Sequence, residues 1–121
     1  MSVAVFGSIN MDVIAYDKDN DGAIHIIDCN ENTSANVTKL LTKSIQELKL
    51  DLTIEPACTN RSDHASFWRY NIPAIVVSQN FFKGEPNPCY HKKCDQADLV
   101  NYPYVGKILT MILHSLSNIQ F

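Results

Sequence analysis

Apolar side chains recur along the chain with two different periods. In two segments they return every three or four positions, as on one face of an amphipathic helix. The first set comprises Val37, Leu40, Leu41, Ile45 and Leu48, and the second comprises Val105, Ile108, Leu109, Ile112, Leu113 and Leu116. We therefore predict a helix with Thr33 or Ser34 as its N-terminal cap, and a closing helix with Pro103 in its first turn.

Other apolar segments have the length and composition of strands. Residues 3–16 are rich in Val, Ile and Phe, and they predict a buried strand interrupted at Gly7. The turn signal of residues 17–22 follows, and then a second short strand at residues 23–27. This succession of strand, turn and strand predicts a β-hairpin.

The second half of the chain adds two more strands and a short helix. Residues 52–55 predict a short strand, and Ser62 is expected to cap a helix over residues 63–70. Residues 74–77 are continuously apolar, which is typical of a parallel strand covered on both faces. Strands that alternate with helices predict an α/β fold with a mainly parallel sheet flanked by helices. The 121 residues are expected to form a single domain, residues 1–121.

Composition and charge exclude several classes of function. The chain is 45% hydrophobic and 19% charged, which excludes a disordered protein. Its net charge of −3, without a basic face, excludes a nucleic-acid partner. No apolar run approaches the roughly 18 residues that span a bilayer, so no membrane segment is predicted. Residues 1–17 lack the basic region and cleavage site of a signal peptide, so any export signal is expected on a segment outside this chain.

Two polar residues are candidates for metal binding. His91 lies in the long loop of residues 79–98, after a buried strand, where open α/β sheets place their sites. Imidazole is a common zinc ligand, so His91 is either a ligand or an exposed loop histidine. Asp12 interrupts an apolar strand. Unless it faces solvent, its carboxylate needs a cation, a lysine or backbone amides as a partner.

Four cysteines allow three fully paired disulfide connectivities. Cys89 and Cys94 are five positions apart around a short loop, near enough to pair locally. Cys29 and Cys58 fit the interpretation of small buried apolar residues.

The turn after the first predicted strand suggests a second kind of metal site. Residues 17–28 fit the calcium-binding EF-hand loop at positions 1, 3, 5 and 6, with Asp rather than Glu at position 12. An EF-hand needs a helix on each side of its loop, whereas the flanks here predict strands. We therefore interpret the segment as an acidic hairpin turn, with calcium binding as the alternative.

Three motifs together resemble those of the co-catalytic di-zinc aminopeptidases, which include the secreted bacterial leucyl aminopeptidases. They are Asn-Met-Asp-Val-Ile-Ala-Tyr at residues 10–16, Arg-Ser-Asp-His-Ala-Ser-Phe at residues 61–67, and Cys-Tyr-His-x-x-Cys-Asp at residues 89–95. They occur in the order of that family, and the resemblance covers nearly the whole chain. It implies a phosphorylase/hydrolase-like fold, with a mixed sheet between helices, and peptide substrates.

The resemblance also implies roles for single residues. Asp12 would ligate one zinc ion and His91 the other, while Tyr90 would hydrogen-bond the oxygen of the tetrahedral intermediate. Arg61 would line the pocket for the amino end of the substrate. Further positions that match the family are Asp63, His64 and Asp95, which would support the site or cap a helix, and the pair Cys89 and Cys94, which would form a loop disulfide.

The remaining metal-binding motifs of that family are a His-x-Asp pair, a bridging carboxylate and a Glu-Glu pair, and all of them precede the Asp12 motif. Only eleven residues come before Asp12 here. We therefore expect the carboxy-terminal part of a secreted or periplasmic two-zinc aminopeptidase, inactive by itself, which needs an amino-terminal half or forms a homo-oligomer. The alternatives are a non-catalytic binding module on a peptidase-like fold and a glutaminyl-cyclase-like acyltransferase.

Overall fold

A four-stranded mixed sheet forms the centre of the computed structural model, which describes residues 2–120. The strands are β1 (Ser8–Met11), β2 (Ala23–Ile27), β3 (Thr53–Ile54) and β4 (Ala74–Gln79), in the order β1-β4-β2-β3 across the sheet. β4 pairs parallel with β1 and antiparallel with β2, and β2 pairs parallel with β3. The predicted α/β fold with a mixed, mainly parallel sheet is confirmed.

The predicted hairpin between the first two strands is wrong. The chain does reverse direction between β1 and β2, but β4 lies between these strands and pairs with both. All six residues of β4 are buried, and such a strand needs cover on both faces and neighbours at both edges. A local pattern of strand, turn and strand does not reveal that a distant third strand lies between the two.

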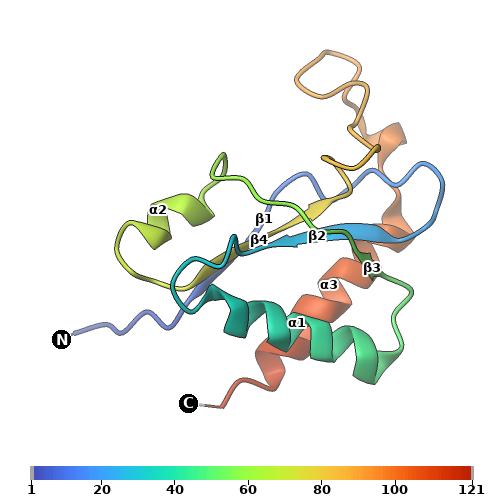
Figure 1. Ribbon diagram of the computed structural model, residues 1–121. Coiled ribbons are helices and arrows are strands. Elements are labelled where there is room, and N and C mark those ends of the chain that lie inside the picture. Colours follow the sequence, from blue (N-terminus) through green and yellow to red (C-terminus); the bar gives the residue numbers. More distant parts are fainter. Residues whose placement is uncertain (1, 121) are drawn as a thin grey trace.

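Two helices pack together against one face of the sheet. These are α1 (Ser34–Leu48) and α3 (Tyr102–Ser117), which lie side by side beneath the strands in Figure 1. Both helices were predicted, and their apolar faces enclose the main core. The core includes Ile24 and Ile26 of β2, Ile75 and Val77 of β4, Leu41 of α1, and Tyr104, Ile108, Met111 and Ile112 of α3. Among residues 2–120, no helix is long and apolar enough to cross a membrane.

The opposite face of the sheet presents a second set of side chains, and other segments of the chain lie over it. Successive side chains of a strand point to opposite faces. Because Ile26 and Val77 face the helices, their neighbours Ile27, Val76 and Ser78 point the other way. The short helix α2 (His64–Trp68) and the long segment between β4 and α3, which contains the 3-10 helix Ala97–Leu99, lie above the sheet in Figure 1.

The predicted side-chain cap of α1 is absent. Thr33 precedes the helix but makes no side-chain cap hydrogen bond. The buried Ser34 hydroxyl instead accepts hydrogen bonds from the Ala74 backbone N–H (2.9 Å) and from Trp68 Nε1 (3.2 Å). Ser34 therefore ties the start of α1 to the start of β4.

Candidate active site

A cavity of about 200 Å³ opens on the sheet face opposite the two long helices. Its floor includes Ile27 of β2 together with Val76 and Ser78 of β4. Three residues singled out from the sequence line the same cavity: Asp12, Arg61 and Tyr90. They come from three separate segments, and the fold brings them together.

Asp12 directly follows β1, at the carboxyl end of a parallel strand. Its backbone N–H still donates to the Val77 carbonyl (3.1 Å), so the sheet holds the main chain at this position. The next residue, Val13, has a φ of 50°, an unfavourable conformation for a β-branched residue. The Val13 carbonyl accepts a hydrogen bond from the Gln79 N–H (2.9 Å), which fixes the turn. Such strain is typical of functional sites.

A hydrogen-bonded chain of side chains orients the Asp12 carboxylate. Asn10 Nδ2 donates to the Ser62 hydroxyl (2.7 Å), and that hydroxyl donates to Asp12 Oδ2 (2.7 Å). The prediction that Ser62 caps α2 is therefore wrong, since Asp63 precedes that helix and makes no side-chain cap bond either. Ser62 is one site residue that the sequence interpretation missed. The signal was present, because Asn10 and Ser62 belong to two of the three quoted motifs.

Arg61 lies on a loop that local hydrogen bonds and one disulfide fix. Its backbone N–H donates to Thr59 Oγ1 (3.2 Å), and the Thr59 carbonyl accepts a hydrogen bond from Nε2 of the buried His64 (2.7 Å). A disulfide joins Cys58 of this loop to Cys29. The interpretation of these two cysteines as unpaired buried residues is wrong, because their approach depends on the tertiary fold.

Aromatic rings form one wall of the cavity. Phe81, Phe82 and Tyr90 line it, with ring centroids 5.2 Å apart for Phe81 and Phe82 and 5.1 Å apart for Phe81 and Tyr90. The fully buried His25 fixes this wall, because its Nε2 accepts a hydrogen bond from the Phe82 N–H (3.1 Å). His25 Nδ1 lies 2.7 Å from the Glu55 carbonyl and must then carry the proton. The wall is thus set by a neutral imidazole.

His91 lies beside this wall, on an exposed turn. Its ring stacks on that of Tyr90, with centroids 3.9 Å apart and an angle of 18° between the planes. The predicted disulfide between Cys89 and Cys94 closes the turn around both residues. His91 itself is not among the described residues that line the cavity. Asp95 accepts a hydrogen bond from Asn87 Nδ2 (3.0 Å) within the same loop.

Comparison with known proteins identifies the family of the chain. The sequence model of Peptidase family M28 matches residues 2–116, and the chain belongs to this family. Members of the family are generally zinc-dependent. The chain is also 33% identical over 57 residues to the uncharacterized protein YfbL of Escherichia coli strain K12, a match that covers 47% of this chain and 17% of YfbL.

The fold is similar to that of a solved aminopeptidase. One structure of the LapA aminopeptidase from Legionella pneumophila matches with a TM-score of 0.73 and 22% identity, over 90% of this chain and 30% of LapA. A second LapA structure matches with a TM-score of 0.74 and 20% identity, over 92% of this chain and 31% of LapA. The chain therefore spans about a third of the length of the structures it matches.

Proposed function

We propose that these 121 residues form the carboxy-terminal part of the catalytic domain of a zinc aminopeptidase that removes amino-terminal residues from peptides. The observation that carries the proposal is the cavity shared by Asp12, Arg61 and Tyr90 in a chain of the M28 family. The alternatives, a binding module and an acyltransferase, have no observation of their own in their favour.

The chemistry of the available donors fits zinc. A carboxylate and an imidazole are both ordinary zinc ligands, and we assign Asp12 to one ion and His91 to a second. The Asp12 carboxylate accepts a hydrogen bond from Ser62 at Oδ2, the kind of outer contact that orients a metal ligand. When bound, zinc supplies a Lewis acid and an activated water at neutral pH.

The other site residues act on the substrate. The Tyr90 hydroxyl is assigned to donate a hydrogen bond to the oxygen that gains negative charge during attack on the peptide carbonyl. Such a hydrogen bond lowers the reaction barrier most in a site shielded from water. Ile27, Val76 and the aromatic wall supply the apolar part of the cavity lining beside Tyr90. Arg61 is assigned to the region that receives the amino end of the peptide.

The 121 residues contain neither a His-x-Asp pair nor a Glu-Glu pair. In the resembling family these motifs supply further ligands and the general base. A hydrolytic centre needs a base to take the proton of the attacking water. When catalytic groups act as a unit, removing any one of them abolishes most of the rate. We therefore propose that the activity requires residues beyond these 121, from an amino-terminal half of the same protein.

An extracellular or periplasmic location fits the two disulfides. Disulfides persist in oxidising compartments and are rare in reducing ones. Secretion is therefore part of the proposal.

The test is hydrolysis of an aminoacyl-anilide by the 121-residue chain and by the natural gene product that contains it. We expect turnover only when the polypeptide also carries the His-x-Asp and Glu-Glu pairs, with loss of turnover on chelation and in His91→Ala. Half-buried His114 of α3 contacts Ser44 and Glu47 of α1 and no site residue, so His114→Ala is the matched control and should retain activity. Chelator-sensitive, His91-dependent turnover by the 121 residues alone contradicts the assignment of missing parts.

A further inference from the structure

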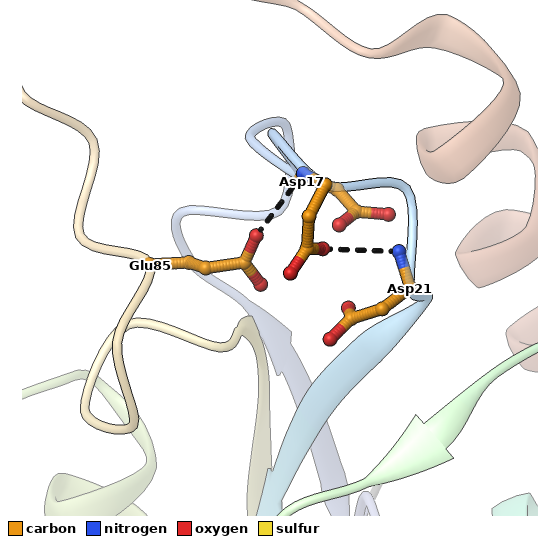
Figure 2. Close-up of side chains that lie close together, drawn as sticks. Asp17, Asp21 and Glu85 are labelled. Carbon is orange, nitrogen blue, oxygen red and sulfur yellow. Dashed lines mark hydrogen bonds between the residues drawn. The ribbon is translucent and has the colours of Figure 1, made fainter.

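Four carboxylates converge at the turn between β1 and β2, on a part of the molecule that the proposed peptidase site does not use. They belong to Asp17, Asp19, Asp21 and Glu85, and one oxygen of each lies within 4.8 Å of the others. Figure 2 shows Asp17 and Asp21 on the turn, with Glu85 directed at it from the loop after β4. The fold thus adds to the acidic turn a fourth acid, 64 positions after Asp21 in the sequence.

Backbone amides engage one oxygen of each carboxylate. Gly22 N–H donates to Asp17 Oδ2 (3.2 Å), and Asp21 N–H donates to Asp19 Oδ1 (3.1 Å). Ala23 N–H donates to Asp21 Oδ1 (2.9 Å), and Asp19 N–H donates to Glu85 Oε1 (3.5 Å). These bonds fix the directions of the side chains.

The second oxygens of two of these groups lack a partner although they are buried. Asp17 is only 6% exposed, and its Oδ1 has no hydrogen-bond partner. Glu85 Oε2 is likewise buried and without a partner. None of the ion pairs among residues 2–120 involves these acids. A buried carboxylate oxygen without a donor or a cation is costly, so a bound cation would stabilise this arrangement.

The raised pKa values of two of these carboxyl groups also favour a bound cation. Burial raises the pKa of the Asp17 carboxyl, and the neighbouring charges of Asp21 and Asp19 raise it further. Burial also raises the pKa of Glu85, with smaller contributions from Asp19 and Asp21. A divalent cation would remove this penalty, because it attracts all four carboxylates at once.

We propose that Asp17, Asp19, Asp21 and Glu85 bind a calcium ion. Calcium prefers carboxylate and carbonyl oxygens at about 2.3–2.6 Å in a flexible geometry. Two ligands on opposite sides of the ion are then about 5 Å apart, close to the 4.8 Å within which these oxygens lie. Magnesium requires a smaller, nearly ideal octahedron, which fits this irregular set less well.

The turn has the backbone that such a site requires. Gly22 has a φ of +71°, and a Cβ atom there would collide with the Asp51 carbonyl, so no larger residue fits. Asn101 Nδ2 donates to the Asp17 carbonyl (3.0 Å) and to Asn20 Oδ1 (2.9 Å), which anchors the turn to the start of α3.

The proposed ion would connect this anchored turn to the loop of the peptidase site. Glu85 lies five positions before Tyr90. The Glu85 carbonyl accepts a hydrogen bond from Gln79 Nε2 (3.3 Å), and its N–H donates to the Asn80 carbonyl (3.0 Å). Calcium would therefore stabilise the root of the loop that carries Tyr90 and His91.

The proposed ligand set and a linear EF-hand loop differ in one residue, Glu85 instead of Asp28. Substitution of each of these residues therefore distinguishes the two schemes. The linear template would use Asp28 at position 12, but Asp28 Oδ2 accepts a hydrogen bond from Thr38 Oγ1 (2.6 Å) and Oδ1 accepts one from the Asn30 N–H (2.9 Å). Glu85 takes the place of Asp28. The two schemes predict opposite effects for Asp28→Asn and Glu85→Gln.

The test is calorimetric titration of the chelator-treated 121-residue chain with calcium chloride, followed by thermal unfolding with and without calcium. We expect one site with a dissociation constant of about 10⁻³ M or tighter and a higher unfolding temperature with calcium. Asp17→Asn and Glu85→Gln should each weaken binding about tenfold or more, since affinity follows the number of charged ligands. Asp28→Asn should bind as the unchanged chain does.

Three results would overturn the proposal: no saturable calcium binding by the folded chain, equal affinity for magnesium, or normal binding by Glu85→Gln. If Asp17→Asn fails to fold, Glu85→Gln still decides the outcome, because Glu85 lies in a loop outside the sheet. Circular dichroism of each variant verifies that it is folded. The readout is binding of calcium, so the result is independent of any peptidase activity.

Discussion

The Ser62 hydroxyl donates a 2.7 Å hydrogen bond to Asp12 Oδ2, joining two residues that are 50 positions apart. The same hydroxyl accepts a hydrogen bond from Asn10. One side chain thus orients the carboxylate that we assign to zinc, and it does so through the loop that also presents Arg61 to the cavity.

Replacing Ser62 with Ala is expected to disturb this arrangement without unfolding the chain. Half-buried Asn10 and exposed Asp12 would each lose a partner, so the free energy of unfolding should fall by about 1 kcal/mol at most. In the zinc-loaded natural gene product, zinc affinity should fall by about 10–100-fold, as for other outer contacts of metal ligands. Urea unfolding and competition with a zinc chelator measure the two effects. Ser66→Ala, on the exposed side of α2, is the control, and equal zinc affinity in both variants contradicts the role of Ser62.

The two disulfides should contribute unequally to stability. The Cys29–Cys58 bond closes a separation of 29 residues, which corresponds to about 3–4 kcal/mol of lost chain entropy in the unfolded state. The Cys89–Cys94 bond closes a separation of only 5 residues, which corresponds to about 2 kcal/mol. Denaturant unfolding of the two double Cys→Ser variants, without reductant, compares these contributions.

We expect the larger loss from removal of Cys29 and Cys58. Removal of Cys89 and Cys94 should instead increase proteolytic cleavage of the loop that carries His91. The reverse order of stabilities would contradict the entropic account. Peptide mapping that finds Cys89 and Cys94 as free thiols in the oxidised chain would contradict the second bond itself.

The acidic turn should make the calcium-free chain less stable as the pH rises. The pKa values of Asp17 and Glu85 are raised above their usual 3.8 and 4.5. The folded state therefore holds more protons than the unfolded state over the range from those usual values up to the raised ones, and stability falls as the pH increases through that range. Asp19 acts in the opposite direction, because the Asp21 backbone N–H lowers its pKa. The buried Tyr104 hydroxyl also faces this cluster, but it stays protonated at these pH values.

Comparison of the unchanged chain with Asp17→Asn isolates the effect. In the presence of a chelator, the unchanged chain should lose stability relative to Asp17→Asn between pH 4 and pH 7, and calcium should reverse the difference at pH 7. Urea unfolding at several pH values measures it. A difference that does not vary with pH would show that burial does not perturb Asp17.

Local patterns were sufficient to predict some elements and insufficient for others. The helices α1 and α3 and the strand β4 follow from periodicity and from a continuous apolar run, because each depends on its own residues. The β1–β4 pairing, the Cys29–Cys58 bond and the contribution of Glu85 to the acidic turn depend on approaches between distant segments, which no local pattern records. The hydroxyl groups of Ser34 and Ser62 were assigned to helix caps, but both bond to a distant strand or its end.

Some residues of the candidate site could likewise be predicted from the sequence, and others could not. Asp12, Arg61 and Tyr90 were chosen from motifs, and they line one cavity. The strained Val13 and the aromatic wall of Phe81 and Phe82 were not foreseen, since backbone strain and ring packing arise only once the sheet is assembled.

The most direct measurement is a crystal structure of the natural gene product with zinc, with anomalous scattering recorded at the zinc edge. Our account predicts zinc bonded to Asp12 and to His91 at about 2.0–2.2 Å. Paired ions about 3.5–4 Å apart would leave the Asp12 carboxylate and a His91 ring nitrogen within roughly 8 Å of each other. Zinc bound away from these side chains, or Asp12 and His91 on opposite faces of the sheet, would contradict it.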